Sequence, residues 1–256
     1  MRSFIDLTDR FPLKIDIEGL RAELTRMEGA KWVGHYDTTQ PSTWTTIPLR
    51  SINGVLDGPD AIRHGDWDLY KNTPLVDGYP VMSSIIAAFK CPMARVRLSK
   101  MAARTHINAH RDIEEEVASV AFNQVRLHIP ITTNDKVVFF VGKDQLQMKA
   151  GRLYYADFAK THWVRNDGDE ARVHLFLELK MNDWLRGLFP KFTLIEKADM
   201  ALQRIYLPIF WKLYGFWLFG KPVRWAKQAF EGSLLQKMWR WLRRRGVYTK
   251  PAGNQG

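Results

Sequence analysis

The sequence has almost no cysteine, since Cys91 is the only one among 256 residues. A single thiol excludes an internal disulfide framework and any zinc site built from several thiolates. A bound metal ion would therefore be held by His, Asp or Glu. The N-terminal stretch MRSFIDLTDRFPLKIDIEG also lacks an apolar run as long as a signal-peptide core, because charged residues interrupt it. We therefore expect a cytoplasmic protein.

Acidic residues are scarce in the C-terminal quarter of the chain. The net charge is +11, yet from Gly187 onwards there are 13 Lys/Arg and 3 Asp/Glu, so the first 186 residues are nearly neutral. This quarter also holds half of the ten tryptophans. We interpret residues 1–188 as one catalytic domain, whose length and apolar content suffice for a core, and residues 189–256 as a basic, Trp-rich helical extension.

The extension has the composition of a segment that lies on a membrane surface. The run RIYLPIFWKLYGFWLF is too short and too interrupted by Pro208 and Lys212 to span a bilayer, which takes about 20 apolar residues. The following segment combines tryptophans with Arg and Lys, as in helices bound to anionic lipid. Packing of these aromatics on the catalytic domain, or in a dimer, is the equal alternative. Nucleic acid is disfavoured, because no recognisable binding module accompanies the basic residues.

The catalytic domain has the pattern of a mainly β protein with flanking helices. Helical spacing of apolar residues predicts helices over residues 17–27 and 82–90. Residues 32–77 are rich in Thr, Pro, Gly and Asp, which predicts loops and short strands. Short β-branched or aromatic runs separated by turns predict strands of a β-barrel or sandwich. These runs are ARVRLSKM, NQVRLHIPI, KVVFFVG, QLQMKAG, RLYYADF and ARVHLFLELK.

Three residues form a candidate metal site. His110 and Asp112 are an H-x-D pair, and alternate side chains of an extended segment point to the same side. His162 follows 50 residues after Asp112, where the RLYYADF strand ends, and we expect it to approach from across the barrel. Two imidazoles and one carboxylate on one face leave positions open for oxygen-activating iron(II). Taken alone, the pattern is weak evidence for a metal, because a chain with seven His produces such pairs by chance, and a hydrogen-bonded loop pair with a structural histidine fits it better.

The sequence around these residues resembles a known enzyme family. The runs LSKMAARTHINAHRD, VRLHIPITT, MKAGRLYYADFAKTHWVRN and ARVHLFLEL, over about residues 80–185, are similar to the aspartyl/asparaginyl β-hydroxylase family. This family includes bacterial proline hydroxylases and lipid A 2-hydroxylases. The resemblance implies a double-stranded β-helix, also called a jelly roll or cupin-like fold. It also implies an oxidoreductase, a dioxygenase that uses iron(II), 2-oxoglutarate and O2.

The resemblance assigns roles to individual residues. It implies that His110 and His162 bind iron; Asp112 completes the set, as in the bacterial proline hydroxylases but not in the animal peptide hydroxylases. It assigns Arg172, His128 and Ser99 to 2-oxoglutarate, and an Arg suits a carboxylate because its planar fork donates two parallel hydrogen bonds. We place Arg126 near the substrate, since it shares a strand face with His128. An Arg or Ser of this kind is otherwise a solvated surface group, and we interpret His174 as a core or rim histidine.

These features predict a hydroxylase of an aliphatic C–H bond. Its expected substrate is of amino-acid type, whether free, peptidyl or carrier-bound. The extension favours a second substrate class, a lipid acyl chain hydroxylated at the inner membrane surface. A third interpretation is a membrane-associated protein that uses the barrel only to bind a ligand. The sequence leaves the oligomeric state open.

Overall fold

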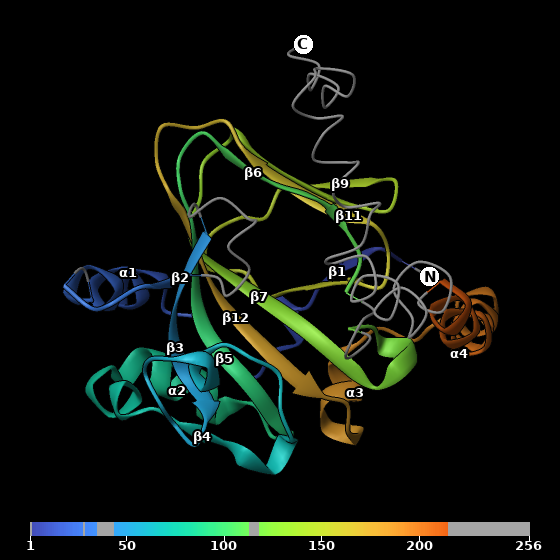
Figure 1. The fold of residues 1–256 in the computed structure, drawn as a ribbon, viewed down its shortest axis with the longest axis horizontal. Helices are drawn as coiled ribbons and strands as arrows, with labels where there is room; N and C mark the ends of the chain where they lie inside the picture. The colour runs from blue at the N-terminus through green and yellow to red at the C-terminus, as the bar shows by residue number, and fades with distance from the viewer. Residues whose placement is uncertain (1, 28, 35–43, 113–117, 215–256) are drawn as a thin grey trace, which may run out of the picture. The chain divides into compact units, whose positions relative to one another are not determined.

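The computed structural model describes residues 2–27, 29–34, 44–112 and 118–214, and of residues 210–214 the backbone alone (Figure 1). The chain divides into two units, Met1–Arg204 and Ile205–Gly256. Nearly all of the second unit lies outside the described residues. The predicted basic, Trp-rich extension over residues 189–256 therefore stays a prediction beyond Tyr214.

The described part is built from antiparallel strands with a few helices. The strands are β1 (Phe4–Asp6), β2 (Val33–Gly34), β3 (Trp44–Ile52), β4 (Tyr70–Asn72), β5 (Met93–Met101), β6 (Thr105–His110), β7 (Gln124–Thr132), β8 (Val137–Val141), β9 (Asp144–Leu146), β10 (Tyr154–Ala156), β11 (His162–Asn166) and β12 (Arg172–Lys180). The α-helices are α1 (Ile17–Arg26), α2 (Pro80–Ala88), α3 (Asp183–Leu188) and α4 (Leu194–Tyr214). Five 3-10 turns complete them: η1 (Thr8–Arg10), η2 (Pro59–Ala61), η3 (Trp67–Leu69), η4 (Pro74–Gly78) and η5 (Val120–Phe122).

Two sheets form the body of the first unit. The larger has the order β1-β10-β7-β12-β5-β3-β2, with β4 paired to β3, and the smaller has the order β6-β11-β8-β9. Figure 1 shows the smaller sheet facing the centre of the larger one. The arrangement confirms the predicted jelly-roll or cupin-like fold, which buries the inner faces of both sheets.

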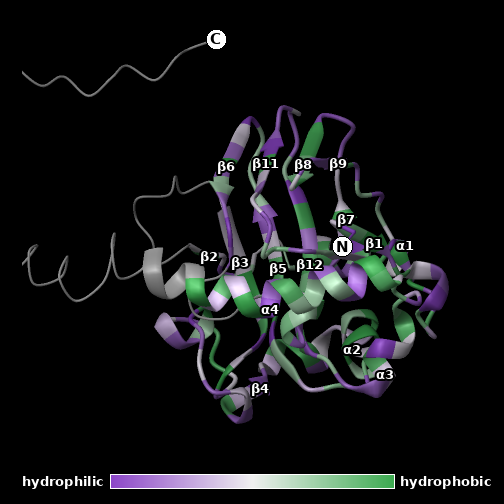
Figure 2. Cartoon of the chain, turned by 90° about the vertical axis from the view of Figure 1, so that its right-hand side faces the viewer, coloured by the Kyte–Doolittle hydropathy of each residue, from purple (hydrophilic) through white to green (hydrophobic). Residues whose placement is uncertain are grey.

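The larger sheet is covered on both faces. Figure 2 shows α2 and α3 on the side of this sheet that is turned away from β6, β11, β8 and β9. Alternate residues of β12, Val173, Leu175 and Leu177, join the apolar core on the helix side. The intervening residues point toward the smaller sheet, because successive side chains of a strand alternate between faces. These inward residues are Arg172, His174, Phe176 and Glu178.

Local capping explains where two helices begin. Asp16 precedes α1, and its carboxylate accepts a hydrogen bond from the Gly19 amide at 2.9 Å. At the start of α4, Glu196 in the first turn accepts from the Thr193 amide at 2.9 Å, and Thr193 Oγ1 accepts from the Glu196 amide at 3.2 Å. This reciprocal pair is a capping box. The predicted helices over residues 17–27 and 82–90 are confirmed as α1 and α2.

Two local expectations differ from the structure. Residues 32–77 contain the nine-residue strand β3, which is longer than the short strands predicted there. Pro48 lies within it, at an irregularity of the β3–β5 pairing between Pro48 and Arg50, where the missing proline amide is tolerated. His162 comes after the end of β10, as predicted, but it also opens a further strand, β11, that was not predicted.

Candidate metal and 2-oxoglutarate site

The three predicted metal ligands lie together. His110 ends β6 and His162 begins β11, and the two are direct partners in the pairing of these strands. They therefore approach from adjacent strands of one sheet, and the expectation that His162 reaches across the barrel is wrong. Asp112 lies just beyond β6, where its amide donates to the carbonyl of Phe158 at 3.0 Å. One ligand atom from each residue lies within 4.8 Å of the others.

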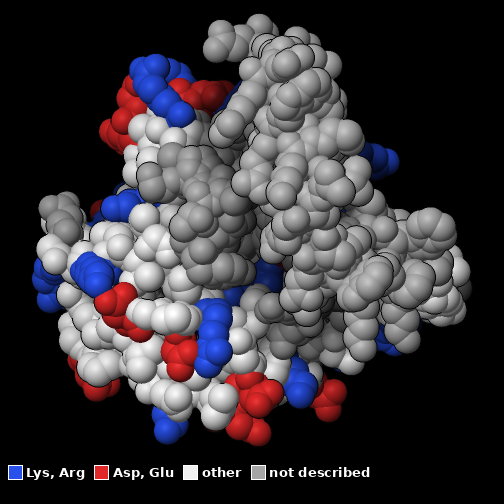
Figure 3. Space-filling model, in the orientation of Figure 1, with Lys and Arg blue, Asp and Glu red and all other residues white. Residues whose placement is uncertain are grey.

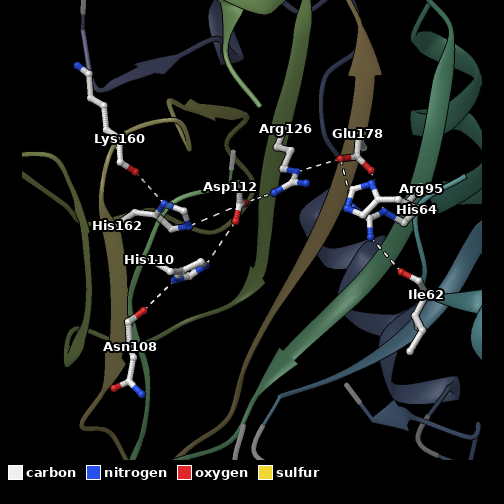
Figure 4. Close-up of polar contacts among 10 residues, drawn as sticks. All are labelled: Ile62, His64, Arg95, Asn108, His110, Asp112, Arg126, Lys160, His162 and Glu178. Carbon is white, nitrogen blue, oxygen red and sulfur yellow. Dashed lines mark hydrogen bonds and ion pairs between the residues drawn. The ribbon is translucent and has the colours of Figure 1, made fainter. Parts of the chain in front are cut away.

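The imidazoles are oriented for a common ion. The Nδ1 atom of His110 lies 2.8 Å from the carbonyl oxygen of Asn108, and that of His162 lies 3.0 Å from the carbonyl oxygen of Lys160 (Figure 4). An Nδ1–H donor to each carbonyl leaves the Nε2 lone pair for a metal. The two Nε2 atoms lie 3.6 and 3.9 Å from the Asp112 carboxylate. Two nitrogens and one carboxylate fit iron(II) with positions to spare.

The charges around this site keep the ligands in their metal-binding forms. Burial lowers the pKa of His162 to about 4, so its imidazole is neutral at neutral pH. Burial alone would raise the pKa of Asp112, but attraction by Arg126, His162 and His110 outweighs it and the pKa is lowered. The Arg126 guanidinium donates directly to this carboxylate. Asp112 is therefore an anion that is already held in place.

Arg126, which we predicted to lie near the substrate, is engaged by two carboxylates. Besides Asp112, its Nε donates to Oε1 of Glu178 at 2.9 Å. Glu178 is fully buried and also accepts from Arg95 at 2.8 and 3.2 Å. Figure 4 shows this chain of ion pairs running from the metal ligands to Arg95, which also has a hydrogen bond with His64. The structure thus places Arg126 beside the metal ligands, where it orients Asp112.

The predicted 2-oxoglutarate residues lie on the inner face of the larger sheet. Arg172 and His128 are both buried, and the Nε of Arg172 and the Nε2 of His128 are buried without a partner among the described residues. Burial lowers the pKa of Arg172 to about 10. Unpartnered buried donors favour an anionic ligand, because burial without one costs free energy. The donor set therefore fits a carboxylate of 2-oxoglutarate.

His174 links these residues and was missed as a site residue. It is buried, as expected of a core histidine, but its Nδ1 lies 3.1 Å from Nη1 of Arg172 and 3.3 Å from Nδ1 of His128. On the neighbouring strand β5, Ser99 is its partner in the pairing, and Ser99 Oγ accepts from Nε1 of Trp44 at 2.8 Å. All of the predicted cosubstrate residues are thus brought together around His174.

One aromatic side chain connects the two halves of the site. The ring of Phe158 lies 4.7 Å from that of His162 and 5.4 Å from that of His128. Sequence reasoning also missed Glu178. The signal was present in β12, where Arg172, His174 and Glu178 alternate with apolar residues, so that a charged group recurs on the inward face.

On the face drawn in Figure 3, the described charged side chains do not gather in a patch. Figure 3 shows acidic and basic side chains interspersed over the described part of the face in view. This agrees with the near-neutral composition of the first 186 residues. The ionisable groups of the candidate site are instead those on the inner faces of the two sheets.

Comparison with known proteins supports the resemblance seen in the sequence. A sequence model described as aspartyl/asparaginyl β-hydroxylase matches residues 15–181. No curated protein sequence matches significantly.

Several solved structures are similar to this chain at low identity. HygX from Streptomyces hygroscopicus, with nickel and 2-oxoglutarate bound, is 10% identical, with 71% of this chain and 84% of that chain covered and a TM-score of 0.45. A 2OG-Fe(II) oxygenase family oxidoreductase from Burkholderia pseudomallei is 12% identical, with 62% and 77% covered and a TM-score of 0.42. A cupin domain from Bordetella pertussis is 18% identical, with 36% and 88% covered and a TM-score of 0.27. Likenesses this distant carry no argument about the reaction.

Proposed function

The chain belongs to the aspartyl/asparaginyl β-hydroxylase family, and from this premise we propose that it is an iron(II)- and 2-oxoglutarate-dependent dioxygenase. It hydroxylates an aliphatic carbon of an amino-acid-type substrate, which is free, peptidyl or carrier-bound. The observation that carries the proposal is the cluster of His110, Asp112 and His162, whose ligand atoms lie within 4.8 Å of one another.

The residues of the chain have separate tasks in this reaction. His110, Asp112 and His162 hold the metal, and Arg126 fixes the Asp112 carboxylate. Arg172 holds the remote carboxylate of 2-oxoglutarate, assisted by His128 and Ser99. Iron(II) with 2-oxoglutarate and O2 supplies the oxidising power that turns C–H into C–OH, with release of succinate and CO2. The ring of Phe158 packs edge-on against that of His162 and helps to hold this imidazole in place.

The presence of Asp112 is the reason for proposing an amino-acid-type substrate. The resemblance associates a carboxylate at this position with the bacterial proline hydroxylases, whose substrates are amino acids. In this chain the carboxylate is present and anchored by Arg126. A lipid acyl chain is therefore the second candidate.

Succinate formation tests the proposed reaction. The purified full-length protein, given iron(II), O2, 2-oxoglutarate and a cell extract, is expected to form succinate and to add one oxygen atom to a product found by mass spectrometry. His162→Ala is expected to lose both. His106→Ala is the matched control, because His106 is an exposed histidine on the same strand as His110. Equal succinate from the wild type and His162→Ala would favour a ligand-binding protein without catalysis.

One observation favours the lipid alternative. In α4, Leu194 and Ile195 are 83% and 81% exposed, and Leu202 follows on the same side of the helix at 59%. None of the described helices is long and apolar enough to cross a membrane. Exposed leucine and isoleucine side chains within the basic extension suit an anionic bilayer surface.

Vesicle binding tests this alternative separately. The full-length protein is expected to co-sediment with phosphatidylglycerol vesicles, and the double variant Leu194→Ser, Ile195→Ser to bind less. Leu56→Ser and Leu69→Ser serve as controls, since these leucines are exposed outside α4. Equal binding by all variants, or no binding by the wild type, contradicts a membrane role for α4.

A further inference from the structure

Arg97 is a cation on the inner face of β5 that the proposed reaction does not yet use. Its neighbours on that face are Arg95, paired with Glu178, and Ser99, bonded to Trp44. Arg97 has no ion pair with any described carboxylate, and its Nε is buried without a hydrogen-bond partner. The residue as a whole is only partly buried. The N–H groups of the Arg97 guanidinium can therefore donate hydrogen bonds to a ligand.

Two aromatic rings fix the plane of this guanidinium. The Cζ atom of Arg97 lies 4.7 Å from the ring centroid of Trp44 and 4.5 Å from that of Phe176. Stacking on aromatic faces stabilises the cation but leaves its N–H groups, which lie in the guanidinium plane, without acceptors. Such a fork matches the two oxygens of a carboxylate. The rings of Trp44 and Phe176 therefore orient the Arg97 guanidinium so that its N–H groups can bind an anion.

Arg97 is connected to the metal ligand Asp112 through Phe176 and Arg126. The ring of Phe176, on which it stacks, is 5.3 Å from the ring of His128 and 5.9 Å from Cζ of Arg126. Arg126 in turn donates to Asp112. A group bound to Arg97 is thus one aromatic ring away from residues that touch the metal ligands.

Arg97 and Arg172 lie in different places on the sheet. In the pairing of β5 with β12, Arg97 is opposite Phe176, whereas Arg172 is opposite Met101. Four residues of β12 separate these positions, or about 13 Å at the usual rise of a strand. If 2-oxoglutarate is bound by Arg172, Arg97 therefore remains able to bind a second anion.

The local charge also favours an anion. The described inward side chains include four cations, Arg95, Arg97, Arg126 and Arg172, against two carboxylates, Asp112 and Glu178. Burial and then repulsion by Arg95 lower the pKa of Arg97 to about 9, although Glu178 and Asp112 attract it. A bound carboxylate would offset both the cost of burying the Arg97 charge and its repulsion by Arg95.

We propose that Arg97, clamped between Trp44 and Phe176, binds a carboxylate of the substrate. This inference rests on the proposed function and narrows its substrate to an organic acid, such as an amino acid with a free carboxylate. The carboxylate would anchor one end of the molecule while an aliphatic carbon faces the metal.

Nuclear magnetic resonance of the arginine Nε–H groups tests the inference without turnover. The full-length ¹⁵N-labelled protein is loaded with zinc(II) and 2-oxoglutarate, and the Arg97 signal is assigned by its loss in Arg97→Lys. Acetate is the carboxylate probe, acetamide its neutral counterpart and inorganic phosphate the other oxyanion. We expect acetate to shift the Arg97 signal saturably and acetamide to leave it in place. A signal unmoved by acetate, or moved equally by acetamide, makes Arg97 a structural cation only, and stronger binding of phosphate overturns the carboxylate assignment.

Variants separate the two anion sites. Because Arg97→Gln has no Arg97 signal, calorimetric titration measures acetate binding in the variants. Arg97→Gln is expected to weaken it about 10- to 100-fold, since a charge-assisted hydrogen-bonded pair is lost. Lys100→Gln is the matched control, because it removes a positive charge from the opposite face of the same strand. Arg172→Gln is expected to weaken 2-oxoglutarate instead, and an equal loss of 2-oxoglutarate affinity in Arg97→Gln would place Arg97 in the cosubstrate site. Acetate binding is measured on the zinc-loaded protein, which carries out no oxidation. Failure of the succinate assay would therefore contradict the proposed reaction without affecting the test of Arg97.

Discussion

The guanidinium of Arg126 donates a hydrogen bond to the carboxylate of Asp112. Through the same side chain, Asp112 is connected to the buried Glu178 and then to Arg95. The metal ligands therefore rest on an ion-pair network that extends into the larger sheet.

Asp112→Asn is expected to weaken metal binding by more than about 100-fold. Loss of a partner that only orients a ligand already costs about 10- to 100-fold, and here a ligand itself is neutralised. Titration of the protein with zinc(II) against a chelator measures the affinity. Asp169→Asn, which changes an exposed aspartate paired with Arg104, should bind zinc as the wild type does. Unchanged affinity in Asp112→Asn would remove this residue from the ligand set.

Glu178→Gln is expected to destabilise the fold by about 3–5 kcal/mol, because it leaves two buried guanidiniums without their shared anion. Urea unfolding measures the loss, with the exposed Glu170→Gln as control. Burial opposes ionisation of Glu178, but Arg95 and Arg126 outweigh it and hold its pKa far below the ordinary value. Its contribution is therefore present above the unfolded-state pKa and is lost as the pH falls, so the difference between wild type and variant should shrink in acid. A constant difference would contradict the ion pairs.

Asp157 is expected to act on stability in the opposite direction. Burial raises its pKa from 3.8 to about 6, despite Lys160 at 3.9 Å and the Ser119 hydroxyl. The folded state then binds more protons than the unfolded state between these values, so stability falls as the pH rises through this window. The full effect is about 3 kcal/mol at 1.36 kcal/mol per pKa unit.

Asp157→Asn removes this titration. Relative to the variant, the wild type should lose about 2.4 kcal/mol of unfolding free energy between pH 4 and pH 7, which is most of the full effect. Urea unfolding of both proteins across this range provides the measurement. Parallel curves for the two proteins would show that the pKa of Asp157 is not raised in the folded state.

Glu23 is expected to stabilise the scaffold without affecting the site. Its buried carboxylate accepts the amides of Val81 and Met82, at 2.7 and 2.9 Å, at the start of α2. Glu23→Ala leaves these amides unpaired and should cost about 1.5–3 kcal/mol for each bond. Glu18→Ala removes an exposed partner of Arg21 and should cost less than about 1 kcal/mol.

Thermal or urea unfolding measures both glutamate variants. Zinc affinity measured at a temperature where Glu23→Ala remains folded should equal that of the wild type. If zinc affinity falls along with stability, α2 and the metal site are coupled more closely than their contacts indicate.

The elements with strong periodicity were predictable from the sequence. The runs that became β5, β7 and β12 agree with the structure to within one or two residues, because their apolar and inward residues alternate clearly. The strands β6 and β11 were not identified. Their segments, THINAH and HWVRN, mix polar with apolar residues, and β6 is largely exposed. These segments become strands because they pair with each other.

The sequence by itself determined which side chains share a strand face, since a period of two residues is a local property. It therefore determined that Arg126 accompanies His128 and that Arg172 accompanies His174. Only the tertiary structure decided which strands are neighbours. The pairing of β6 with β11 places His162 beside His110, and the order of β7, β12 and β5 brings Arg126, Glu178 and Arg95 together. Such neighbours depend on hydrogen bonds between residues distant in sequence, which no local pattern encodes.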